Sequence, residues 1–421
     1  MIKYLPILLL LLMPLLAQTQ ENKTSNSALL RKKQQEADQW EQKRLQKQTL
    51  SRAVFFKKLA GLNPDSVTEL KMSNLGLTQP PDLSRFYRLK KIDISGNNIK
   101  HFKRKFFKHD SLKTVILSDN PVKRVCFPAK SPIEIVVIDH CNLKRVPCSI
   151  RRLKQLKSLE CTDNHIRRVP LFIRKPDSLN EVNLNFNRIK FNKRAVIRLA
   201  RVEKVLLAGN KLFDLPDNME MMSGVKRLNL ANNNLSRLPE SFGKMQNLET
   251  VIFYKNRFTA IPPEIFNLQN LMEMDFYYNG IHTIPETIGK LTRLKRIYLS
   301  FNKLDKLPES IQYLKQLKFL YIHHNRLKFL PQWLTKLPNL TILDAGFNQL
   351  ISIPDLSVIK PLEEVDIQHN NLEDIPWKLI AKPNLKRLWL RRNPFIEEEE
   401  KAVLKKQIRD KAALGANVYL Y

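Results

Sequence analysis

The sequence predicts an α/β solenoid, with a curved parallel β-sheet on the concave face and short helical or 3₁₀ segments on the convex face. Three observations support this fold class. One apolar pattern recurs in fifteen copies between residues 61 and 395, and most successive copies are 23 residues apart. The apolar fraction of 43% is ordinary for a folded protein. A chain of 421 residues would ordinarily suggest two or three globular domains, but a repeat over most of its length indicates a single extended domain.

The repeat reads L-x-x-L-x-L-x-x-N-x-L, as in the segment from Leu294 to Leu304. Its alternating apolar residues predict a short strand, and such a strand can satisfy its open edges only by pairing in parallel with the next copy. The inward Asn amide is then expected to hydrogen-bond turn backbone groups of its own coil and of neighbouring coils. Along the chain, this column holds Leu75, Asn97, Asn120, Cys141, Asn164, Asn187, Asn210, Asn233, Asn256, Asn279, Asn302, Asn325, Asn348, Asn370 and Asn393.

The second half of each copy reads L-P-x-x-[IF]-x-x-L, as in the segment from Leu238 to Met245. The Pro starts a turn and a helical segment, and the three-residue spacing of apolar side chains turns one side inward. Because the strand layer packs more narrowly than the helical layer, the solenoid is expected to curve with its strands on the concave face.

With these motifs, the chain resembles leucine-rich repeat proteins of the 23-residue, LPxxI-bearing kind, which occur in bacterial exported proteins and eukaryotic signalling scaffolds. The resemblance covers residues 67–395. It implies a partner-binding scaffold whose concave face recognises protein or glycan. The copies around Asn97 and Asn120 lack the LP step, and Lys193 replaces Pro in the copy around Asn187. The first third is therefore expected to be less regular.

Both ends of the chain have their own signals. Residues 1–17 read as a signal peptide, with Lys3 before an apolar run. We therefore expect an exported protein that is secreted, periplasmic or at the cell surface; the alternative is membrane tethering by an uncleaved anchor. In the charged segment 18–60, Ser51 predicts the N-cap of a short capping helix that stops at Gly61, while residues 21–49 fit either a longer helix or a disordered arm. Residues 396–421 are expected to cap the repeats with a helix and a last strand at residues 418–420.

Outward strand and turn positions become rich in aromatic side chains from the copy of Asn256 onward. Rings suit half-buried strands, and a contiguous aromatic surface on an exported protein also marks a binding patch. We interpret the set as the candidate partner-binding surface: Tyr254, Tyr277, Tyr278, Tyr298, Phe301, Tyr321, His323, His324, Phe347 and Trp389.

A second set of side chains lies three and four places after the Asn column, in the early copies only. Neighbouring coils lie about 4.8 Å apart, so these cations are expected to form a ladder along one edge. The edge fits either a solvated surface that serves solubility or recognition of an acidic partner, such as an anionic glycan or lipid. It consists of Lys100, Lys123, Arg124, Lys144, Arg145, Arg167, Arg168 and Lys190.

All four cysteines lie within two copies, and export permits a disulfide. Cys141 and Cys161 occupy inward positions and are expected to be buried thiols. Cys126 and Cys148 lie at nearly equivalent places of adjacent coils, which makes them the candidate disulfide.

The same sequence argues against several function classes. It contains no GxGxxG, GxxxxGK[ST] or GxSxG motif, and no nucleophile and base can be assembled, so we expect neither an enzyme nor a cofactor. No metal-ligand spacing is present. The net charge of +32 would suit nucleic acid, but that partner conflicts with export. The sequence thus favours a non-enzymatic exported scaffold that binds a protein partner on its concave face; the alternative is a surface-associated protein that binds anionic glycan or lipid through the basic edge.

Overall fold

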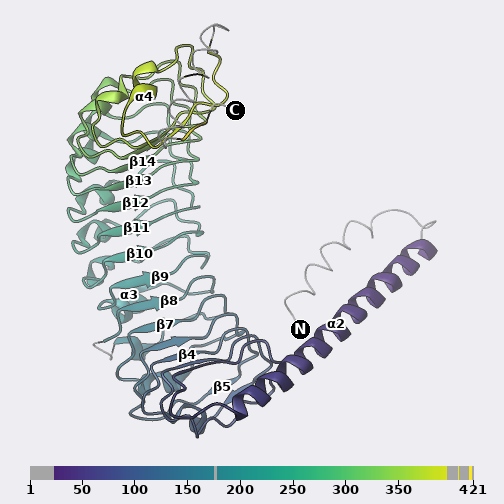
Figure 1. Ribbon diagram of the computed structural model, residues 1–421. Helices are drawn as coiled ribbons and strands as arrows, with labels where there is room; N and C mark the ends of the chain where they lie inside the picture. Colours follow the sequence, from purple (N-terminus) through teal and green to yellow (C-terminus); the bar gives the residue numbers. More distant parts are fainter. Residues whose placement is uncertain (1–22, 175–177, 396–405, 407–416, 420–421) are drawn as a thin grey trace.

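The computed structural model describes residues 23–174, 178–395, 406 and 417–419. One parallel sheet of sixteen strands runs along a curved body, in which every strand pairs with its neighbour in sequence order apart from the two strands of a small second sheet (Figure 1). The fold is a leucine-rich repeat solenoid, as the repeat predicts. Its strands are β1 (Glu69–Lys71), β2 (Lys91–Asp93), β4 (Thr114–Ile116), β6 (Ile135–Val137), β7 (Ser158–Glu160), β8 (Glu181–Asn183), β9 (Lys204–Leu206), β10 (Arg227–Asn229), β11 (Thr250–Ile252), β12 (Glu273–Asp275), β13 (Arg296–Tyr298), β14 (Phe319–Tyr321), β15 (Ile342–Asp344), β16 (Glu364–Asp366), β17 (Arg387–Trp389) and β18 (Asn417–Tyr419).

Each three-residue strand from β1 to β17 buries its central residue and leaves the other two partly or fully exposed. Leu228, Val251 and Met274, for example, are paired in register on β10, β11 and β12. These three side chains are fully buried. Since identical columns stack from coil to coil, the core is one continuous apolar column along the whole solenoid.

The Asn column binds the coils together as the sequence predicts. Asn233 donates from Nδ2 to the carbonyl oxygens of Leu207, Leu230 and Ala231 at 3.1, 2.9 and 3.1 Å. Its Oδ1 accepts the N–H groups of Asn210 and Leu212, each at 3.0 Å.

Cys141 replaces Asn in this column and keeps part of the same pattern. Its Sγ lies 3.2 Å from the carbonyl oxygen of Asp139 and 3.5 Å from that of Leu117. A small buried donor therefore suffices at this position. The thiol fills the role, although it is a weaker hydrogen-bond donor than an amide.

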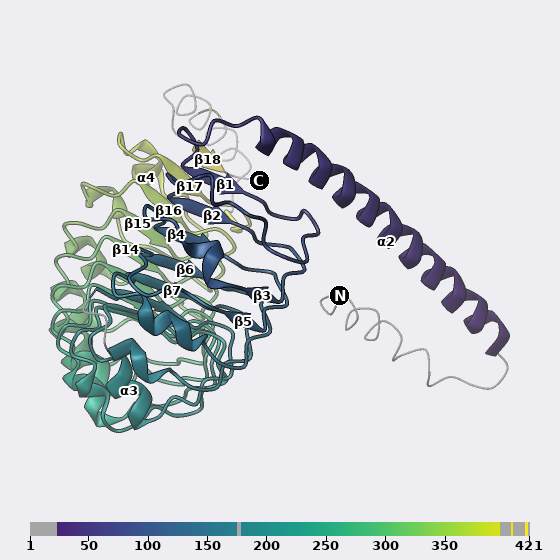
Figure 2. The same cartoon turned by 90° about the horizontal axis from the view of Figure 1, so that it is seen from below.

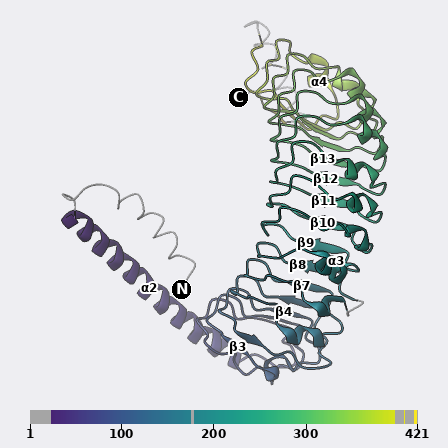
Figure 3. The ribbon, with the colours of Figure 1, turned by 180° about the vertical axis from the view of Figure 1, so that it is seen from behind.

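The Pro of each regular copy precedes a 3₁₀ segment. Pro239, Pro285 and Pro308, for example, hold extended backbone immediately before η7, η9 and η10. Figures 1 and 3 place the helical segments along the outer side of the curve. They are η3 (Arg104–Phe107), η4 (Cys148–Arg152), η5 (Leu171–Arg174), α3 (Lys193–Leu199), η6 (Met219–Met221), η7 (Glu240–Lys244), η8 (Pro263–Asn267), η9 (Glu286–Lys290), η10 (Glu309–Tyr313), η11 (Gln332–Lys336), η12 (Leu356–Val358) and α4 (Trp377–Ala381).

The early copies are irregular, as their sequences predict. β3 (His101–Phe102) and β5 (Arg124–Val125) form the two-stranded second sheet. In the copy of Asn187, the segment without Pro forms the α-helix α3, whose N-cap Asn192 accepts the N–H of Ala195 at 3.1 Å.

The charged N-terminal segment corrects one prediction. It forms a single 38-residue helix, α2 (Lys23–Ala60), which corresponds to the longer-helix alternative for residues 21–49. The expected start of a short helix at Ser51 is wrong, although the end next to Gly61 is as expected. No Gly or Pro interrupts residues 23–60, and the run of Gln, Lys, Arg, Leu and Ala favours helix throughout, which outweighs a capping signal at Ser51. Figure 2 shows α2 extending away from the sheet. Arg85 fixes its end, because Nη2 donates to the carbonyl oxygens of Leu59 and Ala60 at 2.7 and 3.1 Å.

At the other end, β18 extends the sheet by pairing in parallel with β17. The sequence places this strand one residue later, at residues 418–420. The expected signal peptide at residues 1–17 lies outside the described residues, and so does the helix expected after residue 396 apart from Lys406. Among the helices that are described, none has both the length and the apolarity needed to cross a membrane.

Candidate functional site

The turn that follows each strand carries a ladder of aromatic rings in five successive coils. Each ring belongs to the residue immediately before the Asn column or its equivalent. Successive rings stack with centroids 4.1, 3.9, 4.1 and 3.9 Å apart and planes within 16° of each other. We call this set the aromatic ladder: Tyr278, Phe301, His324, Phe347 and His369.

The backbone beneath the aromatic ladder is in the left-handed region. The five φ angles lie between 52° and 55°. Several other coils place residues suited to this conformation at the same point, such as Asn74, Gly96, Gly209 and Asn232, whereas three others carry Phe186, Lys255 and Arg392 there. A bulky ring is uncommon there, because positive φ costs an L-residue about 1–2 kcal/mol. A run of five rings at such positions is therefore not explained by backbone preference.

A second column of rings packs beside the aromatic ladder, two residues before the Asn column. Tyr254 stacks on Tyr277 at 5.6 Å. Tyr277 and His323 each lie 5.3 Å from the ring of Phe301. The structure thus brings seven of the ten predicted aromatic residues into one contiguous cluster.

His369 belongs to the same cluster and was missed by the sequence analysis. Its ring stacks on Phe347 at 3.9 Å. The signal that could have found it is its place directly before Asn370, where the preceding coils carry Tyr, Phe, His and Phe.

The other three predicted aromatic residues lie on the strands. Tyr298 and Tyr321 form a stacked pair, with centroids 4.9 Å apart and planes 5° from parallel. Trp389 lies on β17, where the Arg387 guanidinium is 5.9 Å from its ring centre. All three occupy the last position of their strand. Three acidic residues occupy the same position on the neighbouring strands and pair with them in register. We call this set the strand row: Asp275, Tyr298, Tyr321, Asp344, Asp366 and Trp389.

The carboxyl groups of the strand row have raised pKa values. Burial raises the pKa of Asp275 to about 6 and that of Asp344 to about 7. Burial also raises the pKa of Asp366. Next to them, burial lowers the pKa of His323 to about 4. Near neutral pH the strand row therefore carries less negative charge than three ordinary Asp side chains would, which leaves it an amphipathic surface with a weakened acidic character.

The raised pKa of Asp275 predicts a stability that depends on pH. Between pH 4 and 6 the folded state retains a proton that the unfolded state has lost, so stability falls as pH rises through this window. Asp275→Asn removes this loss and can still accept the Tyr277 N–H, which lies 2.8 Å from Oδ1. We expect urea unfolding to show the variant level with the parent at pH 4 and more stable at pH 8, by up to about 3 kcal/mol.

Asp305→Asn provides the control for this measurement, because Asp305 is exposed and lies on a different column. Its effect should be small at both pH values. A constant difference between Asp275→Asn and the parent at pH 4 and pH 8 would contradict the assignment of a raised pKa.

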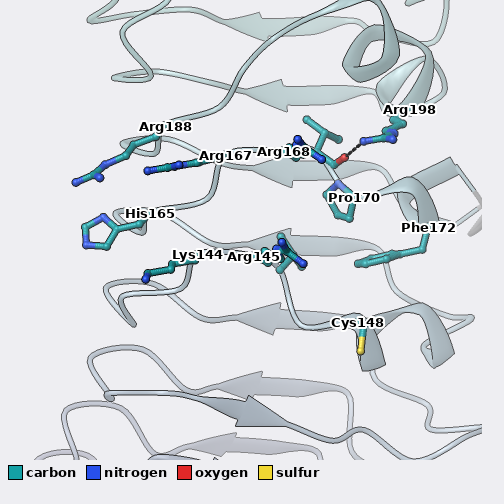
Figure 4. A pocket seen from close by; sticks show the side chains of 12 residues that line it. Lys144, Arg145, Cys148, His165, Arg167, Arg168, Pro170, Phe172, Arg188 and Arg198 are labelled. Atoms are coloured by element: carbon teal, nitrogen blue, oxygen red, sulfur yellow. Dashed lines mark hydrogen bonds between the residues drawn. The ribbon is translucent and has the colours of Figure 1, made fainter.

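The predicted basic edge contains a pocket of about 640 Å³. Four of the eight predicted residues line it, Lys144, Arg145, Arg167 and Arg168, whereas Lys100, Lys123, Arg124 and Lys190 lie outside the lining. Three cationic or titratable side chains that the sequence analysis missed complete it. Figure 4 shows them with their neighbours; they are His165 and Arg188, which directly follow the Asn column, and Arg198 of α3.

The candidate disulfide is not formed in the structure. Cys126 and Cys148 are both free thiols, the first half-buried and the second exposed. The two are one position out of register, because Cys126 follows Asn120 by six residues and Cys148 follows Cys141 by seven. In the repeat, Cys126 is therefore level with Pro147, and adjacent residues direct their side chains differently.

The described residues contain no group of three or more His, Cys, Asp or Glu side chains placed to hold a metal ion. His323, His324 and Asp344, which lie close together, therefore do not form such a group. The Nδ1 atoms of the two histidines lie 2.7 Å apart, which makes the pair a direct hydrogen bond between rings.

Comparisons with known proteins agree with the fold. The sequence matches the leucine rich repeat family over residues 246–304 and 292–350, and again over residues 224–245. The comparison with curated protein sequences gives no match. The chain therefore contains leucine-rich repeats, which generally serve as binding scaffolds rather than enzymes.

Three solved structures illustrate the range of similar proteins. A leucine-rich repeat protein of Leptospira interrogans is 26% identical, with a TM-score of 0.68 over 85% of this chain and 96% of that one. The plant peptide hormone receptor RGFR1, in complex with RGF2, is 25% identical with a TM-score of 0.54 over 79% of this chain and 56% of the receptor. An internalin of Listeria monocytogenes, 18% identical over 85% of this chain and 88% of that one, has a TM-score of 0.58 and shares the fold.

Proposed function

We propose that the chain is an exported scaffold that binds a protein partner through the aromatic ladder and the adjacent strand row. The observation that carries this proposal is the run of five stacked rings at positive φ. Strained residues cluster at functional sites, where the surrounding structure maintains them against their conformational cost. Rings that served only to fill space would be equally useful on the strands, where the backbone is relaxed.

The aromatic ladder has the properties of a binding anchor. Tyr278 and Phe347 are 38% and 36% exposed. Phe347 is stacked between His324 and His369, and Tyr278 stacks on Phe301. These contacts hold the rings in place before any partner arrives, so little side-chain entropy remains to be lost on binding. Large, pre-ordered aromatic side chains are typical of the residues that dominate protein interfaces.

The strand row adds polar specificity next to these anchors. Tyr298 and Tyr321 lie between Asp275 on one side and Asp344 on the other. Hydroxyl and carboxyl groups beside stacked rings can accept hydrogen bonds from a partner and can attract its cationic side chains, which the rest of a chain with a net charge of +32 repels. We therefore expect the partner segment to combine apolar and basic side chains.

The comparisons support this class of function. RGFR1 is solved in complex with RGF2. The 23-residue spacing and the LP step support repeats of the LPxxI-bearing kind, and the Leptospira protein is a similar leucine-rich repeat protein from a bacterium. The apolar run after Lys3 supports export, with the uncleaved anchor as the alternative.

The proposal is tested by removing the aromatic ladder and measuring capture of a partner. We expect Tyr278→Gly, Phe301→Gly and Phe347→Gly each to weaken binding by about 2 kcal/mol, roughly 30-fold. Glycine is chosen because it tolerates positive φ and therefore keeps the fold. The immobilised parent would first be used to identify a partner from the envelope and secreted fractions of its source, and affinities would then be measured with that purified partner.

The matched control removes three exposed aromatic side chains elsewhere, with Phe213→Ala, Tyr313→Ala and Phe329→Ala. These residues are 61%, 60% and 58% exposed. The control variant should bind like the parent. A triple ladder variant that folds normally and keeps the parent's affinity would exclude the aromatic ladder as the partner site.

A further inference from the structure

The basic pocket is built by three successive coils at the point where the repeat is irregular. Lys144 and Arg145 come from one coil, Arg167 and Arg168 from the next, and Arg188 from the third (Figure 4). The helix α3, which replaces the usual 3₁₀ segment because Lys193 stands in place of Pro, supplies Arg198 from the other side. The pocket thus lies where α3 replaces the 3₁₀ segment of a regular coil.

Six Lys and Arg side chains line this pocket, and none of the described residues that line it is a carboxylate. Within the part of the chain that the structure describes, no ion pair involves any of the six; they are Lys144, Arg145, Arg167, Arg168, Arg188 and Arg198. Cations on neighbouring strands are paired across coils. Glu134, for example, contacts Lys113 and Lys157 at 2.6 and 2.7 Å. The pocket therefore concentrates positive charge that the protein does not neutralise itself.

The pocket also has an apolar side. Val146 and Val169 are buried beneath it, and Pro170 and Phe172 are half-buried at its wall. Arg198 donates a hydrogen bond to the carbonyl oxygen of Val169, which holds its side chain across the pocket (Figure 4). A ligand that fits this lining has an anionic group and an attached organic part.

We propose that this pocket binds a phosphate-bearing ligand, with the arginine side chains contacting the phosphate and the Phe172 side receiving the organic part. Guanidinium groups match phosphate oxygens in a bidentate geometry, and five of the six cations are Arg rather than Lys. The volume of about 640 Å³ suits a compact group rather than an extended polymer. This site lies on different coils from the aromatic ladder and does not depend on the protein partner proposed above.

The test is a calorimetric titration of the folded protein with inorganic pyrophosphate, at about 50 and 200 mM salt. We expect saturable binding of one pyrophosphate per chain and a loss of about 10-fold or more in affinity for the double variant Arg145→Gln/Arg168→Gln. Both residues are exposed, so the variant should keep the parent's melting temperature. The charge-conserving pair Arg145→Lys/Arg168→Lys should lose an intermediate amount, because Lys keeps the charge without the bidentate geometry.

The control variant Arg257→Gln/Arg326→Gln removes the same charge from exposed residues of other coils. It should bind pyrophosphate like the parent. If both double variants lost affinity equally, the effect would be one of net charge and the proposed phosphate site would be wrong. The proposal would also be wrong if the parent bound neither pyrophosphate nor anionic vesicles.

A second arm distinguishes a soluble ligand from a lipid headgroup. Sedimentation would use vesicles of phosphatidylcholine alone and of phosphatidylcholine mixed with phosphatidylglycerol. Binding to the anionic vesicles that is lost in Arg145→Gln/Arg168→Gln but kept in the control would identify the source as a lipid headgroup. Pyrophosphate binding with equal vesicle binding by all variants would identify a soluble phosphate ester.

Discussion

Replacing Phe253 by Ala is expected to lower the free energy of unfolding by about 3–5 kcal/mol. Phe253 is fully buried, and its ring lies 5.9, 5.0 and 5.0 Å from those of Phe242, Phe258 and Phe276. These rings come from three successive coils, so the cavity left by the substitution is enclosed by two interfaces between coils. Neither coil can collapse into it without losing register with its other neighbour.

Urea unfolding followed by far-UV circular dichroism would measure this loss. Phe329→Ala is the matched control, because Phe329 is 58% exposed and the same atoms are removed. Its midpoint should lie close to that of the parent. A Phe253→Ala variant that unfolds at the same urea concentration as the control would contradict the continuous aromatic core.

The regular coils could be predicted from the sequence because each copy repeats the same local solution. The Leu, Asn and Pro positions of a 23-residue unit specify a strand, a buried amide and a 3₁₀ segment, and every neighbour confirms the same register. The N-terminal helix α2 was predicted less well. Ser51 resembles an N-cap, but a capping preference of about 1 kcal/mol is small beside the summed helix propensity of the residues before it.

The candidate surfaces were predicted in composition but not in geometry. The sequence located Phe301 and His324 among outward aromatic residues, whereas positive φ is a property of the turn that apolar periodicity does not encode. Arg198 was missed for a related reason. It belongs to α3, in the helical half of its coil, whereas Arg145 and Arg168 follow the Asn column of the two preceding coils. These positions are far apart in the repeat pattern and meet at one pocket only in the folded structure.

The buried amide column predicts the second large effect, a loss of about 2–5 kcal/mol on replacing Asn233 by Ala. Asn233 is 6% exposed, and its Oδ1 accepts two backbone N–H groups, those of Asn210 and Leu212 at 3.0 Å each. Alanine leaves both donors buried without a partner, together with the carbonyl oxygens that Nδ2 now serves. A buried group left unsatisfied costs about 1–3 kcal/mol, which is more than the loss of a solvent-exposed hydrogen bond.

The adjacent residue offers a closely matched control. Asn234→Ala makes the same chemical change one position away, where the side chain is half-exposed and only the backbone N–H donates, to the carbonyl oxygen of Leu212 at 2.7 Å. Thermal and urea unfolding should separate the two variants, with Asn234→Ala near the parent. Because the amide of Asn233 spans two coils, its loss should also weaken their coupling and broaden the unfolding transition of the whole solenoid. Equal midpoints for the two variants would show that the amide column does not join the coils.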